Sequence, residues 1–299
     1  MPRWSLDDFK RAVHDNKGGI YKKLTLDPIP PPEQIIAQAQ TEFLEKSGLK
    51  DSDNVDEQLT WLLDVEYEIY QYHQSKVYTS FLKEMTKWSI QNPGVHPCLD
   101  YLAEKLNYSL ENLAEELLDE EQKILMNVIP NEVALAIVAL EGSVSQGRVT
   151  RAGNSLMEQL QFVLDLHGFH RGVHFEREMD VVGQQPTRLD YVFPNVDFMI
   201  ESANQSVTCA NMTTINDRYR LAIQQLQPNT NRKVLCALGA KAYSASIKKC
   251  SPNILQAFHK NQIKVVVLEN AIGKIKDSTG TVQSYSDWFQ ELKILSKFW

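Results

Sequence analysis

The sequence predicts an α/β protein in which a mixed sheet flanked by helices follows a helical N-terminal domain. Apolar residues recur at helical spacing through residues 1–148, whereas short strand-like runs alternate with helical stretches in residues 149–299. The charge changes at the same point. Residues 1–148 hold 14 Lys and Arg against 25 Asp and Glu, while the remaining 17 basic and 13 acidic residues give a net charge of +4. We therefore expect two domains, 1–148 and 149–299.

Composition excludes several classes of protein. Hydrophobic residues make up 43% of the chain and charged residues 23%, which is typical of a folded protein rather than a disordered one. The longest apolar run, Val133 to Leu140, has 8 residues, far fewer than the roughly 20 that a membrane-spanning helix needs. The N-terminus is polar, and the four cysteines are scattered without a Cys-x-x-Cys pair. We expect a cytoplasmic protein without a disulfide or zinc framework.

In the first half, proline and glycine mark where helices begin and end. The run from Pro28 to Pro32 precedes a helix over 33–46, and Asn92-Pro93-Gly94 ends a helical stretch over 59–91 that is either one long helix or two. Further helices are expected over 99–106, from Ser109 and from Pro130. No catalytic constellation is evident in this half. Its acidity suggests that only the second half meets a polyanion, although solvated Glu-rich helices explain it equally well.

In the second half, the sequence predicts a helix that begins at about residue 155 and ends at Gly168. A hairpin follows, and after it strands and helices alternate. Strands are predicted over 174–182, 188–193, 206–212, 234–238 and 263–268, with helices over 213–227 and 244–260. This alternation is typical of a mixed α/β sheet.

The hairpin carries the first candidate chemistry. Glu178 and Asp180 share one face of their strand because side chains alternate, and Asp190 joins them if the turn sets the pairing suitably. Carboxylates that converge repel one another unless a divalent cation lies among them, and oxygen ligands suit Mg²⁺. Asp190, Asp180 and Glu178 are therefore candidate metal ligands. The alternative is a solvated hairpin face.

Three segments, taken together, resemble a known family. They are 151–158 (RAGNSLME), 189–194 (LDYVFP) and 209–220 (CANMTTINDRYR), of which the last is the most specific. They resemble the catalytic core of type II restriction endonucleases of the PD-(D/E)XK fold, in the group of the EcoRII C-terminal domain, SsoII and PspGI. Those enzymes cut at CCGG, CCNGG or CCWGG. The resemblance covers about residues 149–270 and implies a restriction-endonuclease-like fold.

The resemblance assigns catalytic positions to particular residues of this chain. Glu158 matches the glutamate of the first core helix, and Asp190 matches the aspartate of the PD motif. Met212, however, stands where the family has its catalytic lysine, and Gln225 stands roughly where a further glutamate is usual. A lysine beside the scissile phosphate can orient water or stabilise charge, and methionine can do neither.

Three explanations of this loss compete. The protein is an inactive DNA binder, Met212 is an engineered substitution, or the site is rebuilt from other positions. We favour the rebuilt site, since Glu178 and Asp180 add acids near Asp190. Lys241, just beyond the strand over 234–238, is then the candidate replacement for the lysine. Lys233, at the other end of that strand, is the weaker candidate because a four-residue interval spans about 13 Å.

Base reading is expected at the start of the helix after Met212. The candidates for DNA binding are Asn216, Asp217, Arg218 and Arg220. Arginine pairs bidentately with guanine, and aspartate accepts a hydrogen bond from cytosine. Alternatively, Asp217 is a helix cap and the arginines form surface ion pairs.

The resemblance implies Mg²⁺-dependent cleavage of double-stranded DNA that leaves 5′-phosphate ends, by a homodimer on a palindromic CCNGG or CCGG site. It also implies a cognate DNA methyltransferase in the same cell and, for a CCNGG site, flipping of the central nucleotides. The alternatives are an inactive DNA-binding protein and an all-helical interaction module. The three histidines His167, His170 and His174 do not predict zinc, because Gly168 and Gly172 break the helix that their spacing would need.

Overall fold

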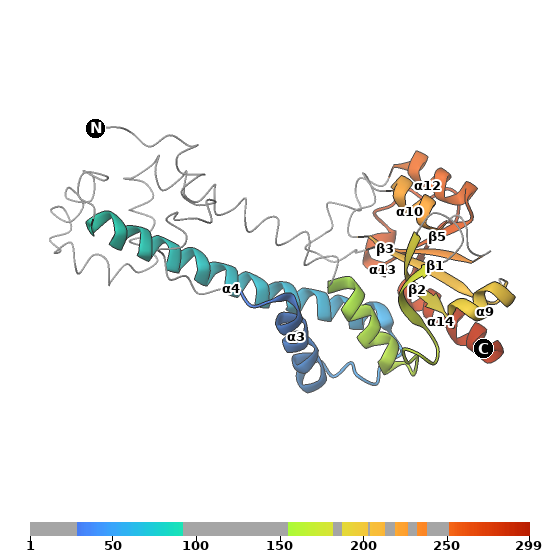
Figure 1. The fold of residues 1–299 in the computed structure, drawn as a ribbon, viewed down its shortest axis with the longest axis horizontal. Helices are drawn as coiled ribbons and strands as arrows, with labels where there is room; N and C mark the ends of the chain where they lie inside the picture. The colour runs from blue at the N-terminus through green and yellow to red at the C-terminus, as the bar shows by residue number, and fades with distance from the viewer. Residues whose placement is uncertain are drawn as a thin grey trace. The chain divides into compact units, whose positions relative to one another are not determined.

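The computed structural model (Figure 1) describes most of the second half of the chain and part of the first. The described residues are 29–91, 155–181, 187–202, 204–212, 219–226, 232–237 and 251–299. The helices predicted over 99–106, from Ser109 and from Pro130 lie outside them. The chain divides into two compact units, one of residues 1–30 and 70–150 and one of residues 31–69 and 151–299. The second unit holds the sheet.

Six strands form this sheet in the order β1-β2-β3-β4-β5-β6. They are β1 (Glu176–Val181), β2 (Thr187–Phe193), β3 (Val207–Met212), β4 (Lys233–Ala237), β5 (Ile263–Val267) and β6 (Val282–Ser284). The pairs β1–β2 and β2–β3 are antiparallel, and the pairs from β3 to β6 are parallel. The predicted mixed sheet is confirmed, and β6 is an addition that the sequence pattern did not predict.

Helices cover both faces of the sheet. Alternation along β3 sends Val207 and Cys209 into one core cluster and Ala210 into the other. A helix over residues 155–166 and α14 (Tyr285–Leu295) pack on the first face, whereas α10 (Tyr219–Leu226) and α12 (Pro252–Lys260) pack on the second. Figure 1 shows α10 and α12 above the strands and α14 below them. The short helices α9 (Val196–Glu201), α13 (Glu269–Ile272) and η2 (Ser296–Phe298) lie between or after these elements.

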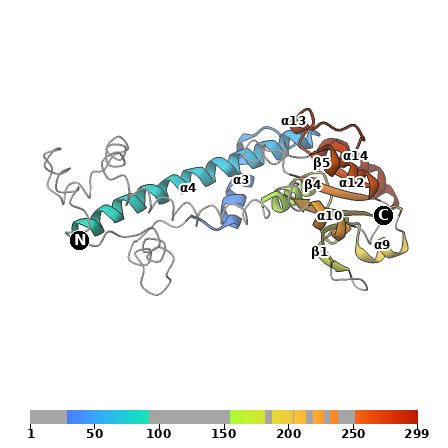
Figure 2. The ribbon, with the colours of Figure 1, turned by 90° about the horizontal axis from the view of Figure 1, so that it is seen from above.

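Two helices precede the sheet in the sequence. The helix α3 (Pro32–Lys46) begins at a proline, whose missing N–H costs nothing in the first turn, and it buries Ile35, Ile36, Ala39 and Phe43 at helical spacing. The helix α4 (Val55–Gln91) is one continuous helix of 37 residues (Figure 2), which decides between the one or two helices predicted there. Among the helices that the structure describes, none combines the length and the apolar character that crossing a membrane requires.

Residues 31–69 pack with the sheet through buried carboxylates. Asp56, 4% exposed, accepts hydrogen bonds from the backbone N–H groups of Glu269 (2.9 Å), Ser286 (2.8 Å) and Tyr285 (3.3 Å). Glu66 accepts hydrogen bonds from Ser155 at 2.7 Å and from Gln159 at 2.8 Å. A buried carboxylate needs such donors because water no longer solvates it. The sheet unit therefore includes residues 31–69, which the expected boundary at 148 would assign to the N-terminal domain.

Candidate active site and nucleic-acid interface

Asp190 lies in β2, beside the end of β3. Its Oδ2 accepts a hydrogen bond of 2.6 Å from the backbone N–H of Asn211. Burial raises the pKa of Asp190, and the nearby charge of Glu178 raises it further, while the N–H of Asn211 and the guanidinium groups of Arg188 and Arg177 act in the opposite direction. The pKa is raised overall, so the folded structure disfavours the ionised form of Asp190.

Glu178 lies opposite Asp190 in the β1–β2 hairpin. The backbone pairs Arg177↔Tyr191 and Met179↔Leu189 flank this position on either side. The φ angle of Glu178 is 59°, in the left-handed region that residues other than glycine rarely adopt. The backbone pairing between β1 and β2 is interrupted at this residue. Its carboxylate accepts a hydrogen bond of 2.7 Å from Arg188. Two of the predicted metal ligands thus face each other, but one of them is already in an ion pair.

The third predicted ligand, Asp180, pairs with Arg188 in the backbone register of the hairpin. Glu176, the first residue of β1, accepts a hydrogen bond of 2.9 Å from the N–H of Val196 at the start of α9. That carboxylate therefore holds a helix in place rather than facing Asp190.

Glu158 projects from the helix over residues 155–166 toward β1. Its Oε1 accepts a hydrogen bond of 2.5 Å from Arg177, and Gln161, one turn further along the helix, accepts another of 2.6 Å from the same guanidinium. The Arg177 side chain is 8% exposed and that of Glu158 is 39% exposed. Burial opposes the charge on Arg177, but the hydrogen bond with Glu158 and the nearby Tyr191 and Glu178 raise its pKa overall. Arg177 remains charged.

Met212 ends β3 with its side chain against the second core cluster, where Met179 and Ile223 also pack. Gln225, on α10, donates a hydrogen bond from its amide to the carbonyl of Arg188 on β2. Neither side chain can be ionised. The two positions at which the resembled family carries a lysine and a glutamate therefore hold an apolar contact and a neutral hydrogen bond.

A resident Mg²⁺ ion would meet two carboxylates that arginine side chains already contact. Among the residues that the structure describes, no three His, Cys, Asp or Glu side chains come together as a metal site. Glu158 and Glu178 are each in an ion pair with an arginine. The metal set of Asp190, Asp180 and Glu178 therefore stays a prediction.

The candidate DNA-reading segment is described only in part. Arg220 lies in the first turn of α10 with an exposed side chain, and its Nε donates a hydrogen bond of 3.2 Å to the hydroxyl of Tyr219. Asn216, Asp217 and Arg218 lie outside the described residues, as does Lys241.

Sequence reasoning did not single out Arg177 and Arg188, although both touch predicted site residues. Arg177 stands between two glutamates in the run from Glu176 to Glu178, and Arg188 stands two residues before Asp190. Basic residues interleaved with acids on a hairpin were the available signal, since cross-strand neighbours of opposite charge attract one another.

Two of the three histidines have other partners in the structure. His170 contacts Asp165 at 3.3 Å, and the ring of His174 accepts a hydrogen bond from the backbone N–H of His170. Gly168 and Gly172 have φ angles of 81° and 79°, which fits the predicted turn at this point.

A mixed sheet covered by helices on both faces, with an aspartate on the second strand of an acidic hairpin, agrees with the restriction-endonuclease-like fold that the sequence predicts. The sequence matches the family described as EcoRII C terminal over residues 116–272, which is more than half of the chain. The chain belongs to this family, and the resemblance expected from the sequence is confirmed. No curated protein sequence matches the chain significantly.

Solved structures with a similar fold include two restriction enzymes. Metal-depleted Ecl18kI in complex with uncleaved, modified DNA is 15% identical, with a TM-score of 0.58, and the match covers 99% of this chain and 86% of that one. The same protein with uncleaved DNA gives 14% identity and the same TM-score and coverage. The complex of restriction endonuclease PspGI with substrate DNA is 16% identical with a TM-score of 0.54, covering 91% of this chain and 95% of that one. At these identities the likeness establishes the fold.

Proposed function

We propose that this protein is a site-specific double-stranded DNA-binding protein of the EcoRII C-terminal family, and that ion pairs with arginine replace its metal-dependent cleavage site. The single observation that carries the proposal is the ion pair of Glu158 with the buried Arg177. A carboxylate that the family resemblance places in the catalytic centre is bound here by a permanent cation of the chain itself.

The charge of the site supports binding without cleavage. Arg177 and Arg188 supply the positive charge beside Glu158, Glu178 and Asp190 that a metal ion would otherwise supply. A divalent cation that took Oε1 of Glu158 would displace the guanidinium of Arg177, which would leave a buried charge without its main partner. Breaking such a pair, whose glutamate is 39% exposed, costs about 2 kcal/mol. Met212 adds no cation beside a scissile phosphate.

DNA recognition is assigned to the start of α10 and the segment before it. Arg220 is exposed there, and the family resemblance adds Asn216, Asp217 and Arg218. A palindromic site of the CCNGG or CCGG type needs a two-fold symmetric protein, so we propose a homodimer. The similar proteins Ecl18kI and PspGI were solved as complexes with DNA, which supports DNA as the partner.

The second candidate function is Mg²⁺-dependent cleavage at the same DNA site, with 5′-phosphate ends and a protective methyltransferase as counterpart. The observation that favours it is the opposed placement of Glu178 and Asp190 in the hairpin. Such an activity would need a cation from outside the described residues, and Lys241 is the candidate.

One experiment separates the two functions. The purified full chain is incubated with plasmid DNA in Mg²⁺ or in EDTA, and the ends of any fragments are sequenced. In parallel, gel shifts compare duplexes that carry CCNGG, CCGG or scrambled sites. Selective shifts in EDTA with an intact plasmid in Mg²⁺ are expected. Discrete fragments that share one motif would instead establish the endonuclease, and the absence of any selective shift would refute both candidates.

A further inference from the structure

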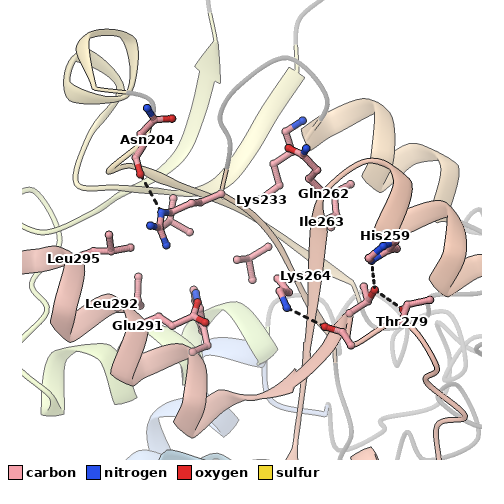
Figure 3. Close-up of a pocket in the computed structure, with 16 residues that line it drawn as sticks. Asn204, Lys233, His259, Gln262, Ile263, Lys264, Thr279, Glu291, Leu292 and Leu295 are labelled. Carbon is pink, nitrogen blue, oxygen red and sulfur yellow. Dashed lines mark hydrogen bonds between the residues drawn. The ribbon is translucent and has the colours of Figure 1, made fainter.

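A cavity of about 610 Å³ lies at the end of the sheet opposite Met212 (Figure 3). Its lining includes Val207, Lys233 and Ile263, which are the first residues of β3, β4 and β5. Met212 is the last residue of β3, so an extended strand of roughly 17 Å separates it from the cavity. The cavity is therefore distinct from the candidate DNA-binding and catalytic edge of the sheet.

One wall of the cavity is apolar. It is formed by members of the first core cluster, namely Val207, Val234, Trp288, Leu292 and Leu295. A ligand that contacts this wall removes apolar surface from water, which favours a molecule with an aromatic or aliphatic body.

The charged side chains of the lining are mostly cationic. Arg232, Lys233 and Lys264 contribute three positive side chains against the single carboxylate of Glu291. Two of the cations are held in position by backbone carbonyls, since Lys264 Nζ donates to Gly280 at 2.9 Å and Arg232 Nε donates to Asn204 at 2.9 Å. Burial lowers the pKa of Lys233, so an anion beside it would stabilise its charged form.

Neutral polar groups complete the cavity. Thr281 contacts Nδ1 of His259 at 3.4 Å and Oγ1 of Thr279 at 2.6 Å, which forms a short hydrogen-bonded chain along one side. Gln262 lies beside Lys233 in the lining, as Figure 3 shows. These groups can bond to hydroxyl, amide or ring nitrogen atoms of a ligand as well as to its charged group.

We propose that this cavity binds a small organic anion of about the size of a mononucleotide, with an apolar or aromatic body and a phosphate, sulfonate or carboxylate group. The apolar wall takes the body, and Arg232, Lys233 and Lys264 take the charged group. The volume lies within the range of ordinary ligand sites. This binding activity is separate from the proposed recognition of DNA, because the cavity shares no residue with the α10 segment or the β1–β2 hairpin.

The test is a fluorescence titration of the full chain with 8-anilinonaphthalene-1-sulfonate, an aromatic sulfonate. The variants Lys264→Gln and Arg232→Gln each remove one cation from the lining. Lys274→Gln is the matched control, since Lys274 is exposed and does not line the cavity. Thermal unfolding of each variant confirms that it is folded. Three competitors are added in turn: deoxyadenosine monophosphate, inorganic phosphate and a short DNA duplex.

The probe is expected to bind at one site, with its Kd raised about threefold by each lining variant and unchanged by the control, since a partly exposed charge contact contributes modestly to binding. Deoxyadenosine monophosphate should displace the probe at lower concentration than phosphate does, because only the nucleotide has a body for the apolar wall. The proposal is overturned if the lining variants bind as the control does, if phosphate competes equally well, or if the duplex displaces the probe. None of these results depends on the gel-shift outcome.

Discussion

The guanidinium of Arg177 donates a 2.5 Å hydrogen bond to the carboxylate of Glu158, and the arginine is the more deeply buried partner. Glu158 remains partly in contact with solvent, whereas Arg177 depends on Glu158 and Gln161 for its hydrogen bonds. This asymmetry predicts different consequences for the two substitutions that break the pair.

Removing the Glu158 side chain should destabilise the fold more than its partial exposure suggests, because the buried charge of Arg177 then loses its carboxylate partner. We expect Glu158→Ala to lower the free energy of unfolding by about 2 kcal/mol, and Glu158→Gln, which keeps an acceptor, by less than half of that. Urea unfolding measures both values. Equal and negligible effects of the two variants would show that the ion pair does not stabilise the fold.

The raised pKa of Asp190 predicts a pH dependence of stability. A carboxyl group whose pKa is higher in the folded protein than in the unfolded chain favours folding while it is protonated, and this contribution is lost as pH rises through the two pKa values. The wild type should therefore lose stability between acidic and neutral pH relative to Asp190→Asn. Urea unfolding of both proteins at several pH values checks this difference. A constant difference across the range would contradict the raised pKa.

Asp56 is expected to be one of the most sensitive positions for stability. Its carboxylate accepts three backbone N–H groups, and Asp56→Ala leaves them without that acceptor, at an expected cost of about 3 kcal/mol. Asp53→Ala is the matched control, because the Asp53 side chain is 90% exposed and forms an ion pair with Lys293 at 3.4 Å. Chemical unfolding of the two variants makes the comparison. Similar small losses in both would mean that Asp56 does not hold residues 31–69 to the sheet.

Restoring the charged groups at the candidate centre should restore cleavage. The double variant Met212→Lys and Gln225→Glu supplies the lysine and the glutamate that the family resemblance expects. Single catalytic donors are commonly worth a hundredfold or more in rate, so we expect at least about tenfold faster Mg²⁺-dependent plasmid nicking than in the wild type. The double variant Met212→Leu and Gln225→Asn is the control. A wild type that already cleaves as fast as the charged variant would refute the proposed replacement of the catalytic site.

Arg220 offers a direct test of DNA binding. Arg220→Ala should weaken the gel shift, and the slope of log K against log salt should become shallower by about 1 if the residue contacts a phosphate. Arg220→Lys distinguishes the two possible roles, because lysine preserves a phosphate contact but loses bidentate pairing with guanine. Unchanged binding in Arg220→Ala would exclude Arg220 from the interface.

The sequence predicted those strands well whose own composition and length identify them. Residues 207–212 and 263–267 form runs whose composition and length identify buried strands without any partner. The strand β6 has only three residues, and it follows a turn-rich segment that resembles a loop in sequence. The helix α14 follows β6 directly and was missed with it.

The candidate site was predictable in its acids but not in their partners. Periodicity along β1 and β2 suggested that Glu178 and Asp190 share a face, and the register places them opposite each other. Periodicity could not show that Arg188 reaches Glu178, because that contact depends on the register of the hairpin. Nor could it show that Arg177 reaches Glu158, because distant residues determine where the helix of Glu158 packs. The same holds for Asp56, whose partners are more than 200 residues away.

The carboxylate of Asp56 bonds to backbone groups 213 and 230 residues further along the chain. During synthesis at roughly 5–20 residues per second, the early helices α3 and α4 therefore wait about 10 to 45 seconds before these partners leave the ribosome. Until then the apolar stripe of α3 and the beginning of α4 have no sheet to cover them. The described helices α3 and α4 therefore expose apolar surface until the later elements of the sheet unit have been made.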